Sequence, residues 1–278
     1  MARRPGLNAA LAAATLAATL AVTLAACTAP EPGVDLPRRL ALLGPVDGFT
    51  HQGWFPLTDR DDVLARTARF AVDGVPAERL LPGPRPLVLL HPVAARLLAM
   101  PYLSWTWYLT GPDPARHPLR ILVGFRDGPP PPPPPDDGTY RPDTTADWAR
   151  EEGWDRGGGF DDLPPHDRGL EITWGASALQ RGSLSPRRPP GADDPDQAAP
   201  HWRYVARGGG ENFGFWWLET VDLAGLHDRA WPGHTAAGTH IAFVAVALAP
   251  EPATESATES ATESAGPVAY LSGLVLSR

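Results

Sequence analysis

The segment 103–109 alternates between large apolar and polar residues, and this pattern limits the fold more than any other feature of the chain. It reads Leu-Ser-Trp-Thr-Trp-Tyr-Leu, so that every second side chain is large and apolar. Successive side chains of a β-strand point to opposite faces, which puts Trp105 and Trp107 together with the two leucines. The alternation therefore predicts a half-buried strand of an antiparallel sheet.

Similar apolar or alternating runs recur along the chain, separated by clusters of Gly, Pro and Asp. The 34 prolines and 28 glycines favour loops and turns over a helical bundle. Further strands are expected at 66–72, 87–90, 119–125, 170–174, 202–207, 215–221, 240–248 and 268–276. So many strands with little helix predict an all-β fold, a two-sheet antiparallel β-sandwich of jelly-roll type with a few short helices and long Pro-rich loops.

Three segments are expected to form short helices. Residues 59–69 place carboxylates near the N-terminal end, where they favour a helix. Residues 91–100 form a second candidate. In 222–230, Asp222 provides an N-cap and the Trp-Pro pair that follows provides a stop signal.

The first 26 residues have the layout of a bacterial lipoprotein signal peptide. Two arginines open the segment, an Ala/Leu/Thr run follows, and Leu-Ala-Ala precedes Cys27. The alternative is a membrane-spanning helix over 7–26, but polar residues dilute it and no stop-transfer flank follows. We therefore expect cleavage before Cys27 and lipidation of this cysteine, which anchors the protein to a bacterial membrane.

The expected domain organisation follows from the proline-rich and polar segments. Residues 27–45 are predicted to be a lipid-anchored tether, and 46–278 a single β-sandwich domain. Insertions are expected at 127–168, which contains a seven-proline run, at 186–200, and at 250–266, which contains three Ala-Thr-Glu-Ser repeats. Cys27 is the only cysteine, so no internal disulfide can stabilise the domain.

Charge and residue spacing provide little support for catalysis or cofactor binding. The formal net charge of −8 argues against nucleic acid or anionic headgroups as partners. His227, His234 and His240 are too far apart in sequence for a typical zinc motif, so no metal or other cofactor is expected. Residues 175–179 contain Gly-x-Ser without the closing glycine of a nucleophile elbow, and no catalytic residue is assigned.

The adjacent residues Trp216 and Trp217 are the best candidates for ligand contact. They must point to opposite faces of the expected strand, so one should pack in the core and the other outside it or under a loop. Asn212 and Glu219 provide polar groups nearby, and an aromatic ring beside such groups can hold a sugar. A loop-covered aromatic cluster without a ligand is the alternative. Glu219 could also form a carboxylate pair with Glu211 in a glycan hydrolase.

Several motifs together resemble an uncharacterised family of exported bacterial proteins, the domain of unknown function 3047. They are the Gly-Trp at 53–54, Leu-x-Trp-x-Trp at 103–107, a Trp…Val-Asp-Leu stretch at 217–223, and Ala-Tyr-Leu-x-x-Leu-x-Leu at 269–276. The resemblance covers most of 46–278. It implies a β-sandwich but no activity and no site residues.

These features together predict a lipid-anchored extracytoplasmic protein. The expected location is the outer membrane, facing the periplasm, because Thr28 rather than Asp follows the lipidated cysteine, as in similar lipoproteins sent there. The expected function is a non-catalytic binding module for envelope glycan. A scaffold that binds another envelope protein, through the proline run at 129–135, and a glycan hydrolase are the alternatives. The expected partners are the membrane, through the anchor, and a glycan or an envelope protein.

Overall fold

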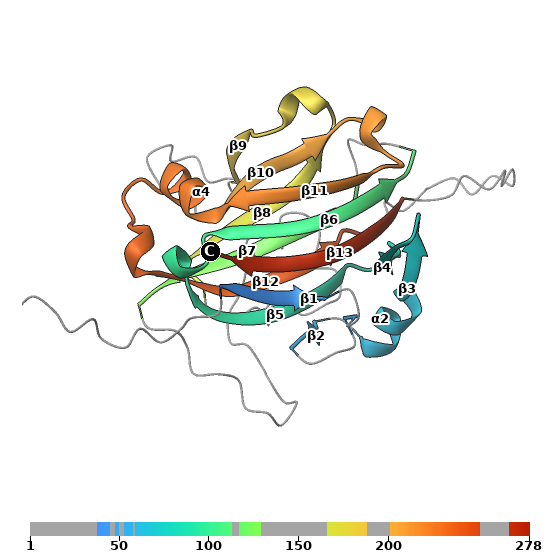
Figure 1. Cartoon of the computed structure of the whole chain (residues 1–278), viewed down its shortest axis with the longest axis horizontal. Helices are drawn as coiled ribbons and strands as arrows, with labels where there is room; N and C mark the ends of the chain where they lie inside the picture. Colours follow the sequence, from blue (N-terminus) through green and yellow to red (C-terminus); the bar gives the residue numbers. More distant parts are fainter. Residues whose placement is uncertain are drawn as a thin grey trace, which may run out of the picture. The chain divides into compact units, whose positions relative to one another are not determined.

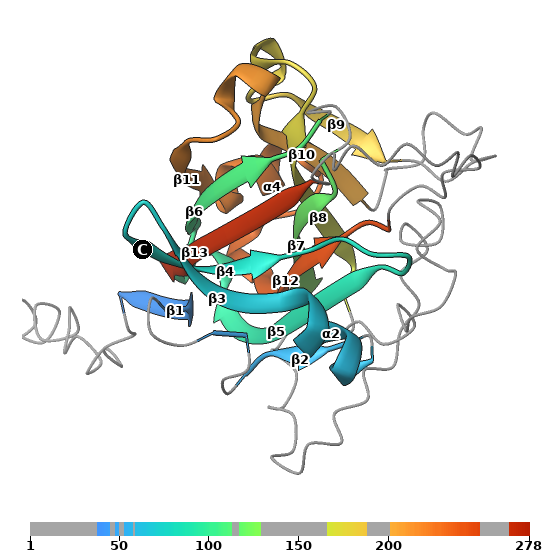
Figure 2. The same cartoon turned by 90° about the vertical axis from the view of Figure 1, so that its right-hand side faces the viewer.

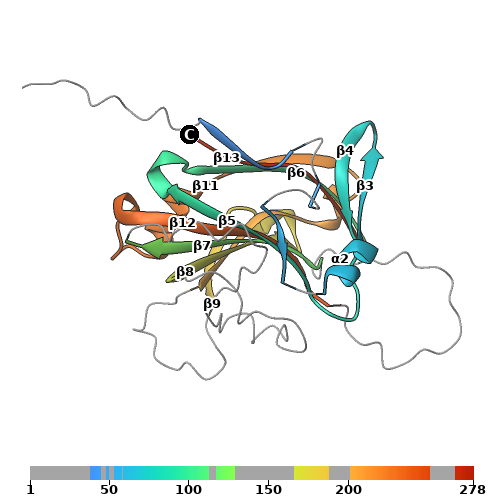
Figure 3. The ribbon, with the colours of Figure 1, turned by 90° about the horizontal axis from the view of Figure 1, so that it is seen from below.

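Two β-sheets packed face to face form the described part of the chain, as the side view in Figure 3 shows. The structure, a computed structural model, describes residues 38–44, 48–49, 53–57, 59–112, 117–128, 166–187, 201–250 and 267–278. Apolar side chains from both sheets form the main core between them. The predicted all-β, two-sheet sandwich is confirmed.

The first sheet has six strands, which Figure 1 shows in front. Its order is β11-β6-β13-β4-β3, and β1 also pairs with β13. Every pairing in this sheet is antiparallel. The strands are β1 (Arg39–Leu43), β3 (Thr67–Val72), β4 (Val75–Leu80), β6 (Tyr102–Thr110), β11 (Trp216–Asp222) and β13 (Val268–Ser277).

The second sheet has seven strands in the order β2-β5-β12-β7-β8-β10-β9. Its β8 and β10 run parallel, which corrects the expectation of a fully antiparallel sandwich. The cause is topological, because β10 inserts between β8 and β9, and pairs antiparallel with β9. The strands are β2 (Phe55–Pro56), β5 (Leu87–Arg96), β7 (Leu119–Asp127), β8 (Arg168–Gly175), β9 (Leu184–Arg187), β10 (His201–Gly208) and β12 (Thr239–Leu248).

Two of the three expected helices are present. Helix α4 (Leu223–Ala230) begins at its predicted cap, where the Asp222 carboxylate accepts a hydrogen bond from the Gly225 amide at 2.9 Å. Helix α2 (Arg60–Arg66) is shorter than predicted, because the chain changes to β3 at Thr67. The described residues also include the short 3-10 helices η1 (Leu97–Ala99), η3 (Ala178–Gln180), η4 (Gly210–Asn212) and η5 (Ala236–Gly238).

The prediction of a helix over 91–100 is wrong. The strand β5 continues to Arg96 and is followed only by η1. Pro92 lacks the amide hydrogen that a strand interior needs. It is tolerated because its partner Phe243 lies at an irregularity of the pairing between β5 and β12.

Alternation on β6 places its two tryptophans in the core, as predicted. Trp105 and Trp107 are fully buried, and their rings meet edge to face with centroids 5.3 Å apart. Trp107 also contacts Trp174 of the opposite sheet at 5.4 Å. These rings therefore link the two sheets across the core.

Several predicted features lie outside the described residues. They include the signal peptide, Cys27, the proline run at 129–135 and the Ala-Thr-Glu-Ser repeats at 253–264. The tether expected over 27–45 ends earlier than predicted, because β1 pairs with β13. Within the described part of the chain, no helix has the length and apolar character needed to span a membrane.

Candidate functional site: an aromatic row on the six-stranded sheet

The edge strand β11 separates the candidate residues onto two faces of its sheet. Trp217, Glu219 and Val221 point inward. Burial alternates along the strand, because Glu219 and Val221 are buried whereas Leu218 and Asp222 are exposed. Trp217 packs against the main core, whereas Trp216 lies on the outer face. The adjacent tryptophans thus occupy opposite faces, and the four candidate residues do not form one site.

The inward-facing residues form a closed contact between the sheets. Glu219 is 4% exposed and forms ion pairs with Arg207 of β10 and with Arg181, which follows η3. The Arg207 guanidinium lies over the Trp217 ring, 3.7 Å from its centroid. We call Glu219, Arg207, Arg181 and Trp217 the Glu219 clamp. Because its polar groups bond to one another, it fits a structural role better than ligand binding.

Asn212 contributes to this region through its backbone and its own turn. The Trp217 indole N–H donates to the Asn212 carbonyl at 2.9 Å, and the Asn212 amide group donates to the Gly208 carbonyl at 2.7 Å. The side chain of Asn212 thus holds the turn between β10 and β11. Neither contact brings it to the outer face beside Trp216.

The outer face carries a row of aromatic side chains across three neighbouring strands. Trp216 of β11 is paired directly with Tyr108 of β6, and Tyr108 directly with Tyr270 of β13. Directly opposite residues of paired strands share a face. The ring centroids are 5.5 Å apart between Trp216 and Tyr108, and 5.8 Å between Tyr108 and Tyr270. We call these three residues the aromatic row.

The β3–β4 hairpin, drawn in cyan in Figure 2, fixes the outer end of this row. Its base pairs with β13, while Val72 at its tip accepts a 3.0 Å hydrogen bond from the Trp216 indole N–H. The turn residues Asp73 and Gly74 both have positive φ, as the tight turns that match the strand twist require. The polar edge of the Trp216 ring is thus held in place, and the ring is half-buried.

Hydroxyl groups and exposed apolar side chains lie further along the strands of the row or next to them in sequence. Ser104 and Thr220, on the same two strands as Tyr108 and Trp216, share a hydrogen bond of 2.9 Å at the surface. Phe215 and Leu218 are 60% and 69% exposed, although both are large and apolar. Such a mixture of accessible apolar area and hydroxyls is typical of a ligand-binding surface.

A second polar cluster lies on the seven-stranded sheet around Glu171. The nitrogen–oxygen distances from this buried carboxylate are 2.9 Å to Arg120, 3.2 Å to Arg203 and 3.4 Å to Arg187. Beside it lies a pocket with about 270 Å³ of empty space, open solvent included. Its lining residues are Leu122, Val123, His166, Gly169, Leu170, Glu171, Arg187, His201 and Phe243.

The pocket does not support the hydrolase alternative. Neither Glu211 nor Glu219 is among its lining residues, and Glu211 lies exposed on η4. Glu171 is bound by three guanidinium groups, and burial, followed by the charges of His166 and Arg187, lowers the pKa of His201 to about 3. This neutral histidine and ion-paired carboxylate do not form the carboxyl pair of a glycosidase.

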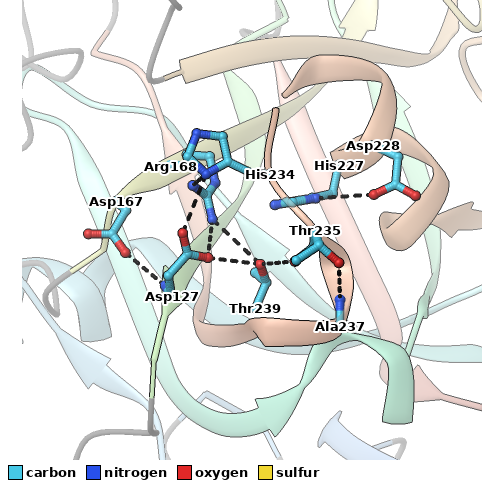
Figure 4. A network of polar contacts seen from close by, with 9 residues as sticks. All are labelled: Asp127, Asp167, Arg168, His227, Asp228, His234, Thr235, Ala237 and Thr239. Carbon is cyan, nitrogen blue, oxygen red and sulfur yellow. Dashed lines mark hydrogen bonds and ion pairs between the residues drawn. The ribbon is translucent and has the colours of Figure 1, made fainter. Parts of the chain in front are cut away.

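A third polar network joins the strand ends of the seven-stranded sheet, as Figure 4 shows. Asp127 of β7 forms an ion pair with the buried Arg168 of β8 and accepts a 2.9 Å hydrogen bond from Thr239 of β12. His234 lies 2.7 Å from an Arg168 nitrogen. The hydrogen bond from Arg168 lowers the pKa of Asp127. Arg168 and Thr239 are buried, whereas Asp127 and His234 are half exposed, so this network ties strand ends together at the surface of the sheet.

Metal binding has no support in the described residues, among which no group of three or more His, Cys, Asp or Glu is placed to hold an ion. His227 and His240 are buried and His234 is half exposed, and burial lowers the pKa of the first two. His227 and His234 both lie near Arg168 and Asp127, but the first is buried and the second is half exposed. They therefore fit structural positions better than a shared ligand set.

Comparisons with known proteins find distant similarity to solved structures. No family model and no curated protein matches the chain. A mutant of ENZbleach xylanase is 10% identical, with a TM-score of 0.30 over 78% of this chain and 75% of its own. Endoglucanase 3 of Trichoderma harzianum, from family GH12, is 9% identical, with a TM-score of 0.31 over 81% of this chain and 97% of its own. Likeness at this level carries no information about the activity of the chain.

Proposed function

We propose that the protein is a lipid-anchored, non-catalytic binding module whose aromatic row binds an envelope glycan. The observation that carries the proposal is the alignment of Trp216, Tyr108 and Tyr270 on the outer face of the six-stranded sheet. In the Glu219 clamp, both carboxylate oxygens of Glu219 pair with arginines of the clamp itself. The outer face, in contrast, combines partly exposed aromatic rings with hydroxyls.

The chemistry of the row suits a sugar chain. The apolar face of a pyranose stacks on an aromatic ring, while its hydroxyls need hydrogen-bonding partners at the ring edge. Neighbouring rings lie 5.5 and 5.8 Å apart and are inclined to each other by 54° and 79°, so that a sugar can stack on the face of one ring while the next sugar contacts the edge of its neighbour. Tyr108 and Tyr270 add phenolic hydroxyls to those of Ser104 and Thr220.

The proposed location rests on the N-terminal sequence. A signal peptide that ends at Cys27 would export the protein and leave it attached to a membrane by its lipid, facing the periplasm from the outer membrane. A binding module held there would meet envelope glycans at high local concentration. Export thus supports a glycan as the ligand of the aromatic row.

Isothermal titration of the full chain in mild detergent with a panel of envelope glycans tests this proposal. Saturable binding of one glycan class is expected, and Trp216→Ala should weaken it at least tenfold. Trp217→Phe is the matched control, because it alters the neighbouring ring on the inner face and should leave the affinity within twofold. No binding by any glycan, or equal effects of the two substitutions, would contradict the proposal.

A further inference from the structure

We infer that Arg79 gives the aromatic row a preference for acidic glycans, by binding a carboxylate or phosphate group of the sugar chain. This inference rests on the proposed function, because it concerns the chemistry of the ligand at the same row. It adds a charge requirement that the aromatic rings alone do not impose.

Strand register places Arg79 at the end of the row. Tyr270 of β13 is paired directly with Arg79 of β4, just as Tyr108 is paired with Tyr270. Directly opposite residues share a face, so Trp216, Tyr108, Tyr270 and Arg79 follow one another across four strands on the outer face. A sugar chain that lies on the three rings would therefore reach the Arg79 guanidinium next.

The Arg79 side chain is held by stacking rather than by an ion pair. Its guanidinium carbon lies over the Phe70 ring, 4.4 Å from the centroid, and Phe70 belongs to the neighbouring strand β3. Its Nε atom is buried without a hydrogen-bond partner. Within the described part of the chain, no carboxylate forms an ion pair with Arg79. The ring thus fixes the plane of the cation and leaves its charge available to a ligand.

The charge distribution around the row supports an anionic ligand. Arg69 and Glu78, the other charged residues of the hairpin strands, pair with each other at 3.5 Å, and Glu78 is buried. The remaining carboxylate of the hairpin, Asp73, lies exposed in its turn at the opposite, Trp216 end of the row. Asp222 lies at the far end of β11 and caps α4. The protein as a whole has a formal charge of −8, so its overall electrostatic field would repel an acidic glycan. A local cation at the row is therefore needed for such a ligand to bind.

The geometry of a guanidinium suits both candidate anions. Its planar fork forms paired hydrogen bonds to a carboxylate or a phosphate, which lysine cannot match. In envelope glycans the carboxylate occurs on uronic or muramic acid residues, and the phosphate on polyol-phosphate chains. Both groups offer negatively charged oxygens to Arg79, and the probes below distinguish them.

Isothermal titration of the full chain with three probes of similar length tests the inference. The probes are peptide-free peptidoglycan strands, whose muramic acids carry carboxylates, a glycerol-phosphate polymer, and chitin oligosaccharides, which have a similar sugar backbone without charge. One of the two acidic probes is expected to bind at least tenfold more tightly than chitin, and raised salt should reduce this difference. The acidic probe that binds identifies the anion.

Substitutions at Arg79 separate this inference from the proposed function. Arg79→Gln should weaken acidic binding about tenfold and leave chitin binding unchanged, as expected for loss of a charged hydrogen bond. Arg79→Lys keeps the charge and should retain part of the preference. Arg229→Gln makes the same charge change on the exposed surface of α4 and should have no effect. Thermal unfolding confirms that each variant is folded.

Two results would overturn the inference. If Arg79→Gln binds acidic and neutral probes as the unmodified protein does, while Trp216→Ala abolishes binding, the row binds glycan without a charge preference. The proposed function then stands and the role of Arg79 falls. If no probe binds to the unmodified protein, both the inference and the proposed function are contradicted.

Discussion

Replacement of Glu219 by Gln is expected to lower the free energy of unfolding by about 3 kcal/mol. The carboxylate side chain is 4% exposed and its partner Arg207 is 12% exposed. Glutamine has nearly the same shape but no charge, so the Arg207 guanidinium would remain buried without its counter-charge. Loss of one partner from a buried ion pair is far more costly than loss of a surface pair.

Arg181 provides the matched control, because it binds the same carboxylate from the surface. Its side chain is 57% exposed, and solvent screens its ion pair with Glu219. We expect Arg181→Gln to cost about 0.5 kcal/mol or less. Urea unfolding followed by intrinsic tryptophan fluorescence measures both values. For a chain of this size, Glu219→Gln should also lower the melting temperature by about 6–12 °C.

Two outcomes would refute this account of the Glu219 clamp. The first is a Glu219→Gln variant whose stability lies within about 1 kcal/mol of the unmodified protein. The second is a loss of glycan affinity with unchanged stability, which would return Glu219 to the ligand site that the sequence predicted. Equal costs for Arg181→Gln and Arg207→Gln would likewise contradict the role assigned to burial.

Three further perturbations test the fold and the anchor. Gly124→Ala should destabilise the protein by about 1–3 kcal/mol in urea unfolding, because the new methyl group would meet the Phe243 ring at 2.1 Å. Burial, followed by the charge of Arg120, lowers the pKa of His117 from 6.5 to about 3. The unfolded chain therefore gains a proton below pH 6.5 that the folded state does not, and stability should fall by up to about 1.4 kcal/mol per pH unit. His117→Asn, which cannot titrate, should flatten this acid-side loss, and an unchanged pH profile would disprove the assignment. Cys27→Ser should release the protein from the membrane fraction in cell fractionation, whereas full retention would argue against lipidation.

The sequence predicted the strands whose alternation is regular. On β6, Trp105 and Trp107 alternate with polar residues and lie in the core as expected. On β4, Pro76 interrupts the sequence and Glu78 faces inward, so the apolar period is lost and the strand was not predicted. A buried carboxylate in a strand requires a tertiary partner, here Arg69, which local sequence patterns do not reveal.

The aromatic row could be predicted only in part. The sequence indicates that Trp216 and Trp217 occupy opposite faces, but not which one faces outward. That choice depends on the pairing of β11 with β6, which brings Trp216 beside Tyr108 although they are far apart in sequence. Tyr270 joins them from the last strand, so the row arises from register between distant segments. The hydrophobic pattern shows which residues of a strand share a face, but it does not show which distant strand lies beside it.

Two-dimensional ¹H–¹⁵N NMR of the indole N–H groups during glycan titration tests the binding face most directly. The Trp216 indole N–H, which donates to Val72, should shift progressively and saturate with the bound fraction of protein. The Trp217 indole N–H, which donates to Asn212 inside the sandwich, should keep its position. A shift of Trp217 alone, or glycan binding that leaves Trp216 unmoved, would contradict binding at the aromatic row.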